Sequence, residues 1–286
     1  MFTTLITAQE LMSLQKDQTP LMVFDCSFEL MKPLEGDAQY LQSHIAGAQR
    51  ADLDRHLSAA QNDPAAASGG RHPLPAREAF AAWLAGLGFS AHMQAVVYDR
   101  QGCNYCGRLW WMLKWLGHDA VAVLDGGLKA WLAAGGAVQS GAALSNQVSK
   151  FAPAHTEYTL TVTKTVAKQL GRASQTVIDA RATPRFLGEV EPLDPVAGHI
   201  PGALNRPFGL NFTPEGTFKP AATLREEFLA LLGPNDPSTV VHQCGSGVSA
   251  VPNLLAMEIA GLGRTALYAG SWSEWCSDPA RPVAQG

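Results

Sequence analysis

The chain has 286 residues, of which 47% are hydrophobic and 16% are charged. This composition excludes a disordered, collagen-like or low-complexity protein, and the length predicts two domains. The 21 Lys and Arg residues against 25 Asp and Glu residues give a formal net charge of −4, without the basic excess that marks nucleic-acid binding. Nucleic acid is therefore not an expected partner.

The apolar stretches are interrupted by charged residues, Gly or Pro before they reach the roughly 20 residues that span a bilayer. The first 20 residues lack the basic start, apolar run and small-residue cleavage site of a secretory signal. The five cysteines are an odd and sparse set, which does not indicate a disulfide framework. We therefore expect a cytoplasmic protein with free thiols, no membrane association, and a monomer as its default state.

The predicted elements, taken in chain order, occur twice. The first half has a strand at 23–25, a His-Ile-Ala-Gly motif at 44–47, an Ala- and Gly-rich loop at 62–70, a strand at 96–98, a helix at 108–116 and a Gly-Gly-Leu motif at 126–128. The second half has a strand at 177–179, a His-Ile-Pro-Gly motif at 199–202, a helix at 224–232, a strand at 239–242, a helix at 250–260 and a Gly-Ser-Trp motif at 270–272. Alternating strands and helices predict an α/β fold with mostly parallel sheets flanked by helices.

The spacing between the repeats locates an insertion. It is 155 residues from His44 to His199 and 144 from Trp131 to Trp275, so the first half carries 11 extra residues, which we assign to the loop at 62–70. The polar segment 141–158 indicates a linker. We therefore predict an N-terminal domain at 1–140 and a C-terminal domain at 159–286.

The segment from Val240 to Ala250 carries the most informative pattern. A buried strand ends at Cys244, a Gly-Ser-Gly loop follows, and a helix begins near Ala250. Ligand sites of open α/β sheets lie at the carboxyl ends of strands, where loop N–H groups and a helix N-terminus stabilise a thiolate over a thiol. At the spacing of 144 residues, Arg100 takes the place of Cys244 in the first half, so the N-terminal domain lacks the nucleophile.

Three chemistries are open to a cysteine in this position. A phosphatase or arsenate-reducing loop needs Cys-x5-Arg, but Ala250 occupies the Arg position. An acyl-transfer enzyme needs a positioned His base, for which His242, His199 and His72 are candidates. Sulfur transfer needs only a thiolate and a set of N–H donors that hold a persulfide, and the loop fits this requirement best.

The motifs together resemble the tandem-domain rhodanese family, in particular its 3-mercaptopyruvate sulfurtransferase branch, over nearly the whole chain. The segments that carry the resemblance are Cys-Gly-Ser-Gly-Val-Ser at 244–249, the motif at 199–202, Leu-Asp-Gly-Gly-Leu at 124–128 and Tyr-Ala-Gly-Ser-Trp-Ser-Glu-Trp at 268–275. The resemblance implies that Cys244 takes a sulfur from 3-mercaptopyruvate, releases pyruvate and passes the sulfur to a thiol such as thioredoxin, or to cyanide. It implies no metal and no organic cofactor.

The resemblance also implies further site residues. Ser246, His72 and Asp54 match a relay that delivers a proton to the pyruvate enolate, and Arg185 matches the family's substrate-binding Arg. We expect the loop to bind the donor through the residues Gly245, Gly247, Val248 and Ser249.

Two features bear on which donor is used. Thiosulfate-using members resemble Cys-Arg-x-Gly-Val-Thr, whereas Gly245 and Ser246 are uncharged here and suit a monoanionic keto acid. The second Arg expected in a Glu-Pro-Arg motif is Leu193 in this chain, so carboxylate binding should be weaker. A thiosulfate sulfurtransferase and a non-catalytic rhodanese-like binding module are the alternatives.

Cys103 and Cys106 form a Cys-x-x-Cys motif without a second pair for zinc.

Overall fold

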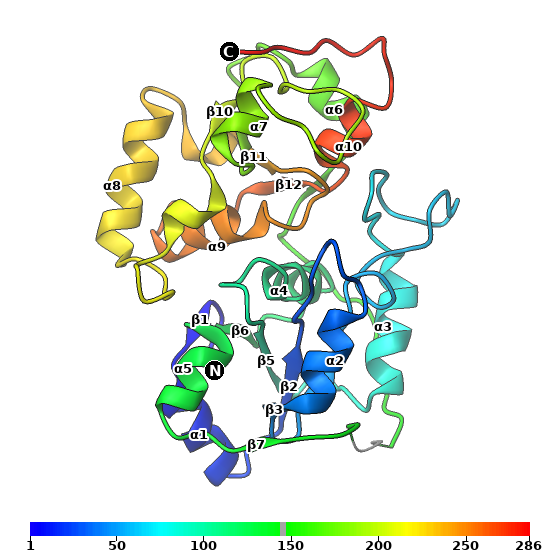
Figure 1. Ribbon diagram of the computed structural model, residues 1–286, viewed down its shortest axis with the longest axis vertical. Coiled ribbons are helices and arrows are strands. Elements are labelled where there is room, and N and C mark those ends of the chain that lie inside the picture. Colours follow the sequence, from blue (N-terminus) through cyan, green and yellow to red (C-terminus); the bar gives the residue numbers. More distant parts are fainter. Residues whose placement is uncertain (144–146) are drawn as a thin grey trace. The chain divides into compact units, whose positions relative to one another are not determined.

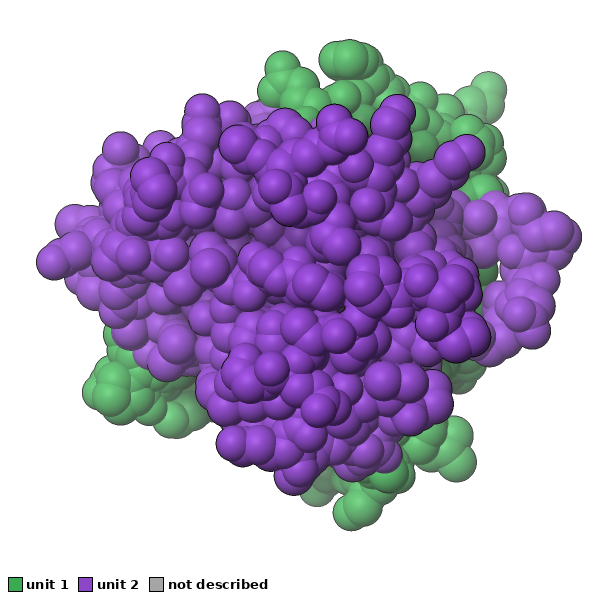
Figure 2. All heavy atoms as spheres, turned by 90° about the horizontal axis from the view of Figure 1, so that it is seen from above, with its two compact units in different colours: residues 1–59, 75–157, 213–218 green, residues 60–74, 158–212, 219–286 purple. Residues whose placement is uncertain are grey.

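The computed structural model describes residues 1–143 and 147–286, so the part of the predicted linker at 144–146 lies outside the described residues. The described chain forms two compact units, each built on its own sheet (Figure 1). Unit 1 comprises 1–59, 75–157 and 213–218, and unit 2 comprises 60–74, 158–212 and 219–286 (Figure 2). The segment 60–74 therefore belongs to unit 2, although the first repeat encodes it. The predicted domain boundaries at 140 and 159 stay a prediction.

Unit 1 contains a five-stranded parallel sheet in the order β1-β6-β5-β2-β4. Val96 of β5 packs with Leu11 of α1 and Trp131 of α5 in one core cluster, whereas the ring of Phe24 in β2 lies 6.2 Å from that of Trp83 in α3. The strands are β1 (Leu5–Ile6), β2 (Leu21–Asp25), β4 (Gln49–Arg50), β5 (Gln94–Tyr98) and β6 (Val121–Leu124), with β3 (His44–Ile45) and β7 (Val138–Gln139) as an antiparallel pair. The helices are α1 (Ala8–Lys16), α2 (Glu35–Gln42), α3 (Arg77–Gly86), α4 (Cys106–Trp115) and α5 (Gly127–Ala133).

Unit 2 repeats this architecture with a parallel sheet in the order β10-β9-β11-β12-β8. Val177 and Val241 pack with Trp272 and Trp275 of α10 on one face, and α8 and α9 lie on the other side (Figure 1). The strands are β8 (Leu160–Thr161), β9 (Thr176–Asp179), β10 (Leu204–Asn205), β11 (Val240–Gln243) and β12 (Ala266–Tyr268). The helices are α6 (Thr163–Lys168), α7 (Thr183–Leu187), α8 (Ala221–Leu232), α9 (Val251–Ile259) and α10 (Ser271–Trp275), with 3-10 turns at Phe208–Asn211 and Pro237–Thr239.

The predicted fold class is confirmed, because both sheets are parallel and flanked by helices. Every residue of β5 and β11 is buried, as expected for central parallel strands that are covered on both faces. The predicted strand at 239–242 begins one residue later, since Thr239 ends a 3-10 turn. No helix within 1–143 or 147–286 has the length and apolar character needed to cross a bilayer.

Candidate functional site

Cys244 lies at the carboxyl end of the central strand of unit 2. Strand β11 ends at Gln243 and α9 begins at Val251, and we call residues 244–250 between them the Cys244 loop. The backbone of Cys244 is fixed by α10, because its N–H donates to Ser271 Oγ at 3.1 Å and its carbonyl accepts from Trp272 N–H at 3.0 Å. The side chain is buried, with Cys244 only 2% exposed. The sulfur therefore has a defined position at the end of the sheet.

The conformation of the Cys244 loop depends on Gly247. Its φ is +74°, and a Cβ built there would lie 2.2 Å from the carbonyl oxygen of Ala269. Only glycine fits such a position. Within the described residues, the backbone N–H groups of Ser246, Val248 and Ala250 donate to no acceptor, so the loop presents unused donors.

Strand pairing identifies the counterpart of Cys244 in unit 1. Val23 pairs with Val96 and Val177 pairs with Val241, which gives a spacing of 145 residues between β5 and β11. By this register Asp99 corresponds to Cys244, and the prediction of Arg100 was wrong. The hydrogen bonds agree, because Leu128 N–H donates to the Asp99 carbonyl as Trp272 N–H does to that of Cys244.

The loop of unit 1 encloses a carboxyl group at the position of the thiol. The buried carboxylate of Asp99 accepts from four backbone N–H groups at 2.8 to 3.0 Å, namely those of Gln101, Cys103, Tyr105 and Cys106. Burial raises the pKa of Asp99, although these four hydrogen bonds act in the opposite direction. In unit 1 the backbone N–H groups of the loop therefore surround a carboxyl group, and in unit 2 Cys244 occupies the position of that aspartate.

Ser246 is hydrogen-bonded to His72, with 2.7 Å between Ser246 Oγ and His72 Nδ1, and both residues are buried. The segment 60–74 carries His72 to this place, and its approach requires Gly70, whose φ is +87° and whose added Cβ would lie 2.4 Å from the carbonyl oxygen of Gly270. Asp54, the third predicted relay member, is an exposed residue of unit 1. Its role in the relay stays a prediction.

Arg185 of α7 also faces the Cys244 loop. Its Nε and Nη2 donate to the carboxylate of Glu191 at 3.2 and 2.6 Å, and Nη2 lies 3.2 Å from Asp194 Oδ2. Its Nη1 would lie 3.6 Å from a Cβ built on Gly245. Leu193, which occupies the position of the expected second Arg, donates only its backbone N–H to Glu191.

Sequence reasoning missed Arg71. Its Nη1 donates to Asp194 Oδ1 at 2.6 Å, and its Nη2 would lie 3.1 Å from a Cβ built on Gly245. Its backbone N–H donates to Ser273 Oγ at 2.9 Å, which ties the segment to α10. The one available signal was its position next to His72, at the end of the Gly-rich insertion.

The surroundings of His242 and His199, the other candidate bases, do not favour a catalytic role for either residue. Burial lowers the pKa of His242 to about 3, with a further contribution from Arg206, and neither ring nitrogen has a partner among the described residues. His199 stacks on Phe186 at 3.8 Å and bonds to its carbonyl oxygen, as His44 does with Tyr40 in unit 1. These contacts are repeated packing features, and they weigh against Cys-His acyl transfer through either residue.

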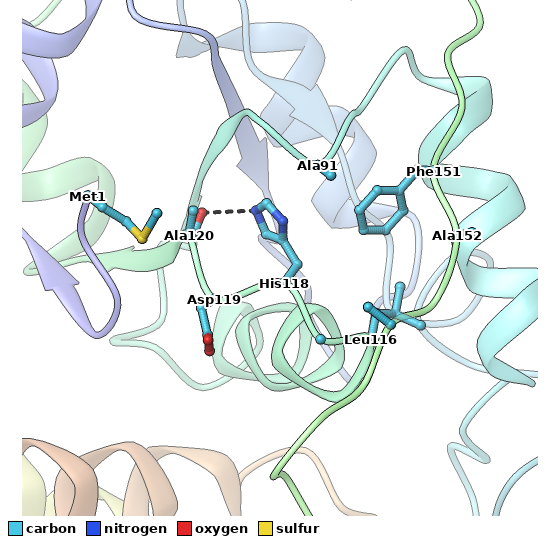
Figure 3. Close-up of a pocket in the computed structure, with 10 residues that line it drawn as sticks. Met1, Ala91, Leu116, His118, Asp119, Ala120, Phe151 and Ala152 are labelled. Atoms are coloured by element: carbon cyan, nitrogen blue, oxygen red, sulfur yellow. Dashed lines mark hydrogen bonds between the residues drawn. The ribbon is translucent and has the colours of Figure 1, made fainter.

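Two further features of unit 1 lack the chemistry of the Cys244 loop. Cys103 and Cys106 are buried, and burial raises the pKa of Cys106 well above its usual value. A pocket of about 160 Å³ contains His118, which bonds to the carbonyl oxygen of Ala120, beside Phe151 (Figure 3). No cluster of metal-binding side chains occurs in the part of the chain that the structure describes.

Comparison with known proteins places this geometry in context. The family model described as "Rhodanese-like domain" matches residues 7–134 and 162–278. The "Probable 3-mercaptopyruvate sulfurtransferase" of Pseudomonas aeruginosa is 44% identical over 99% of this chain and 98% of its own length. A Mycobacterium tuberculosis protein named for thiosulfate sulfurtransferase activity is 40% identical over 99% of this chain and 97% of its own. The crystal structure of a 3-mercaptopyruvate sulfurtransferase from Escherichia coli superimposes with a TM-score of 0.79 at 29% identity, covering 95% of this chain and all of that one.

Proposed function

This chain belongs to the rhodanese-like family, and from that membership we propose that it moves sulfur from 3-mercaptopyruvate to a thiol through a persulfide on Cys244. Sulfurtransferase activity agrees with relatives that match the chain over its full length. The observation that carries the site assignment is the Cys244 loop, in which a buried thiol at a strand end is followed by backbone N–H groups that have no acceptor among the described residues. The proposal needs no metal and no organic cofactor.

In the first step the Cys244 thiolate attacks the sulfur of 3-mercaptopyruvate. A sulfur–sulfur bond forms and the carbon–sulfur bond breaks, and its electron pair leaves as the enolate of pyruvate. The N–H groups of Ser246, Val248 and Ala250 stabilise the negative charge on the sulfur, as the equivalent loop of unit 1 does for the carboxylate of Asp99. Gly245 keeps the approach to the sulfur free of a side chain, and Ser249 completes the loop at its exit into α9.

The enolate then takes up a proton at carbon. We assign the role of proton donor to Ser246 Oγ, and His72, 2.7 Å away, then replaces the proton that Ser246 gives away. Asp54 remains in the proposal as the third member of this relay. A general acid in this position accelerates such a step by about 10²- to 10⁴-fold.

In the second step an acceptor thiolate attacks the outer sulfur of the persulfide. The sulfur–sulfur bond to Cys244 breaks, its electron pair returns to the Cys244 thiolate, and the acceptor becomes a persulfide. We propose a dithiol protein such as thioredoxin as the acceptor, because a second thiol releases the sulfur as sulfide and leaves a disulfide. A cytoplasmic location, which suits free cysteines, and a monomeric state complete the proposal.

The competing donor is thiosulfate, for which the Mycobacterium tuberculosis relative is named. Two guanidinium groups, those of Arg71 and Arg185, lie near Gly245, but the carboxylates of Glu191 and Asp194 offset their charge. A region with no net charge favours a monoanion over a dianion. This balance supports 3-mercaptopyruvate.

Steady-state assays with both donors and a thioredoxin or cyanide acceptor test the choice. We expect a higher kcat/KM with 3-mercaptopyruvate, and a higher value with thiosulfate would overturn the donor assignment. Intact-mass measurement after donor exposure tests the mechanism itself. Wild type should gain about 32 Da, the mass of one sulfur atom, and Cys244→Ser should gain nothing. A wild type without the adduct would support a binding module instead.

A further inference from the structure

Two arginines from distant parts of the sequence converge on one glycine of the Cys244 loop. A Cβ built on Gly245 would lie 3.1 Å from Arg71 Nη2 and 3.6 Å from Arg185 Nη1. Arg71 arrives on the segment 60–74, and Arg185 arrives on α7. The space beside Gly245, the residue that follows Cys244, is therefore bordered by two guanidinium groups.

The acidic partners of these arginines engage other nitrogens. Arg185 uses Nε and Nη2 for Glu191 and Asp194, and Arg71 uses Nη1 for Asp194. Asp194 bridges the two arginines through its two oxygens, and its side chain is 3% exposed. Among the described residues, Arg71 Nε is buried without a hydrogen-bond partner. The nitrogens left for another acceptor are those near Gly245, together with Arg71 Nε.

We propose that Arg71 is a substrate-binding residue that holds the carboxylate of the keto-acid donor together with Arg185, in place of the arginine that position 193 lacks. The inference rests on the proposed function and names a residue that the sequence motifs do not. The fork of a guanidinium group suits a carboxylate, which accepts two parallel N–H hydrogen bonds. Asp194 positions both arginines, because one carboxylate fixes the two forks relative to each other.

This arrangement explains how the chain can have Leu193 at the position where the family's second arginine is expected. A chain that lost one carboxylate-binding arginine without replacement would lose about 10- to 150-fold in donor affinity. Arg71 supplies a guanidinium group at the same loop from a different segment. The register of 145 residues, set against the 155 residues from His44 to His199, reduces the extra length of the first repeat between His44 and β5 from 11 to 10 residues. Arg71 and His72 directly follow the loop at 62–70 to which we assign this insertion, so the same segment brings the cation and the histidine to the Cys244 loop.

The test compares two donors in matched variants. 3-Mercaptopyruvate carries the carboxylate, whereas mercaptoacetone has the same ketone and thiol without it. Arg71→Met should lower kcat/KM for 3-mercaptopyruvate by about 10- to 150-fold and leave that for mercaptoacetone nearly unchanged. Arg71→Lys, which keeps the charge and loses the fork, should fall between wild type and Arg71→Met. Arg172→Met, an exposed arginine of the same unit, serves as the control and should match wild type.

Product inhibition gives a second measurement on the same proteins. The inhibition constant of pyruvate, which retains the carboxylate, should rise in Arg71→Met by a similar factor. Equal losses of kcat/KM for both donors would show that Arg71 has only a structural role. Wild-type kcat/KM values in Arg71→Met would show that Arg71 does not bind the donor. Either result overturns the inference. If wild type does not turn over 3-mercaptopyruvate, the proposed function fails instead, which separates the two claims.

Discussion

The Ser246–His72 pair yields a prediction that depends on the donor. Replacing Ser246 with Ala removes the hydroxyl that lies 2.7 Å from His72 Nδ1, and with it the proposed proton donor to the enolate. Loss of a general acid lowers the rate by about 10²- to 10⁴-fold, which corresponds to about 2.7 to 5.4 kcal/mol of transition-state stabilisation. We therefore expect the rate of pyruvate release from 3-mercaptopyruvate to fall within this range.

Thiosulfate provides the internal control for this prediction. Its leaving group is sulfite, which takes the electron pair on sulfur and needs no proton on carbon. Persulfide formation from thiosulfate in Ser246→Ala should therefore stay close to that of wild type. The measurement is a single-turnover assay that follows pyruvate release from 3-mercaptopyruvate and the mass of the Cys244 persulfide with either donor. Ser174→Ala, which changes an exposed serine of the same unit, is the matched control.

The double variant tests whether Ser246 and His72 act as a unit. If His72 serves only to return a proton to Ser246, then adding His72→Asn to Ser246→Ala costs nothing further, because groups that act together are not additive. Losses that multiply, or an equal decrease with thiosulfate and 3-mercaptopyruvate, would refute the relay and leave Ser246 as a residue that shapes the loop.

Three further predictions concern the scaffold of the site. Gly247→Ala should abolish turnover and destabilise the fold by at least about 1–2 kcal/mol, because position 247 has a left-handed backbone and the new Cβ would lie 2.2 Å from the carbonyl oxygen of Ala269. Thermal unfolding and activity assays measure the two effects. A variant that stays active and stable would contradict the prediction. His242 is neutral when folded, with a pKa of about 3, so wild type should lose about 1.4 kcal/mol of stability per pH unit as the pH falls from 6.5 towards 3. Unfolding of His242→Phe across that window should lack this contribution, and an identical slope in both proteins would refute it. Asp99→Asn removes the carboxylate that accepts from the N–H groups of the unit 1 loop, and it should lower the free energy of unfolding by about 1–3 kcal/mol. The kcat/KM for 3-mercaptopyruvate should stay unchanged. Denaturant titration and steady-state assays measure these two quantities.

The sequence predicts the two-fold architecture because buried parallel strands have a strong signature. The runs at 96–98 and 177–179 are rich in β-branched residues, and each belongs to an interior strand of a five-stranded sheet. The position of Cys244 follows from the same signature, because Gly245 and Gly247 directly after the buried run mark the end of the strand and the start of a turn. The local sequence pattern alone therefore predicts the strands and the position of Cys244.

The register between the repeats and the role of Arg71 required the structure. Val96 and Val97 can be aligned with Val240 and Val241 or with the next pair along, and only strand pairing selects the second alignment and thus Asp99. Arg71 lies in a loop without periodicity, and its function comes from long-range folding onto α10. Such contacts leave no pattern in a single sequence.

The membership of residues 60–74 in unit 2 has a consequence for how this protein can be divided. The second repeat encodes Cys244 and Ser246, but the first repeat encodes His72, which is hydrogen-bonded to Ser246, and the guanidinium group of Arg71. A gene fragment that starts after the linker would therefore encode Cys244 without His72 and Arg71, the residues to which we assign proton delivery and carboxylate binding. Although the two repeats share one fold, neither repeat alone encodes the complete set of residues that forms unit 2.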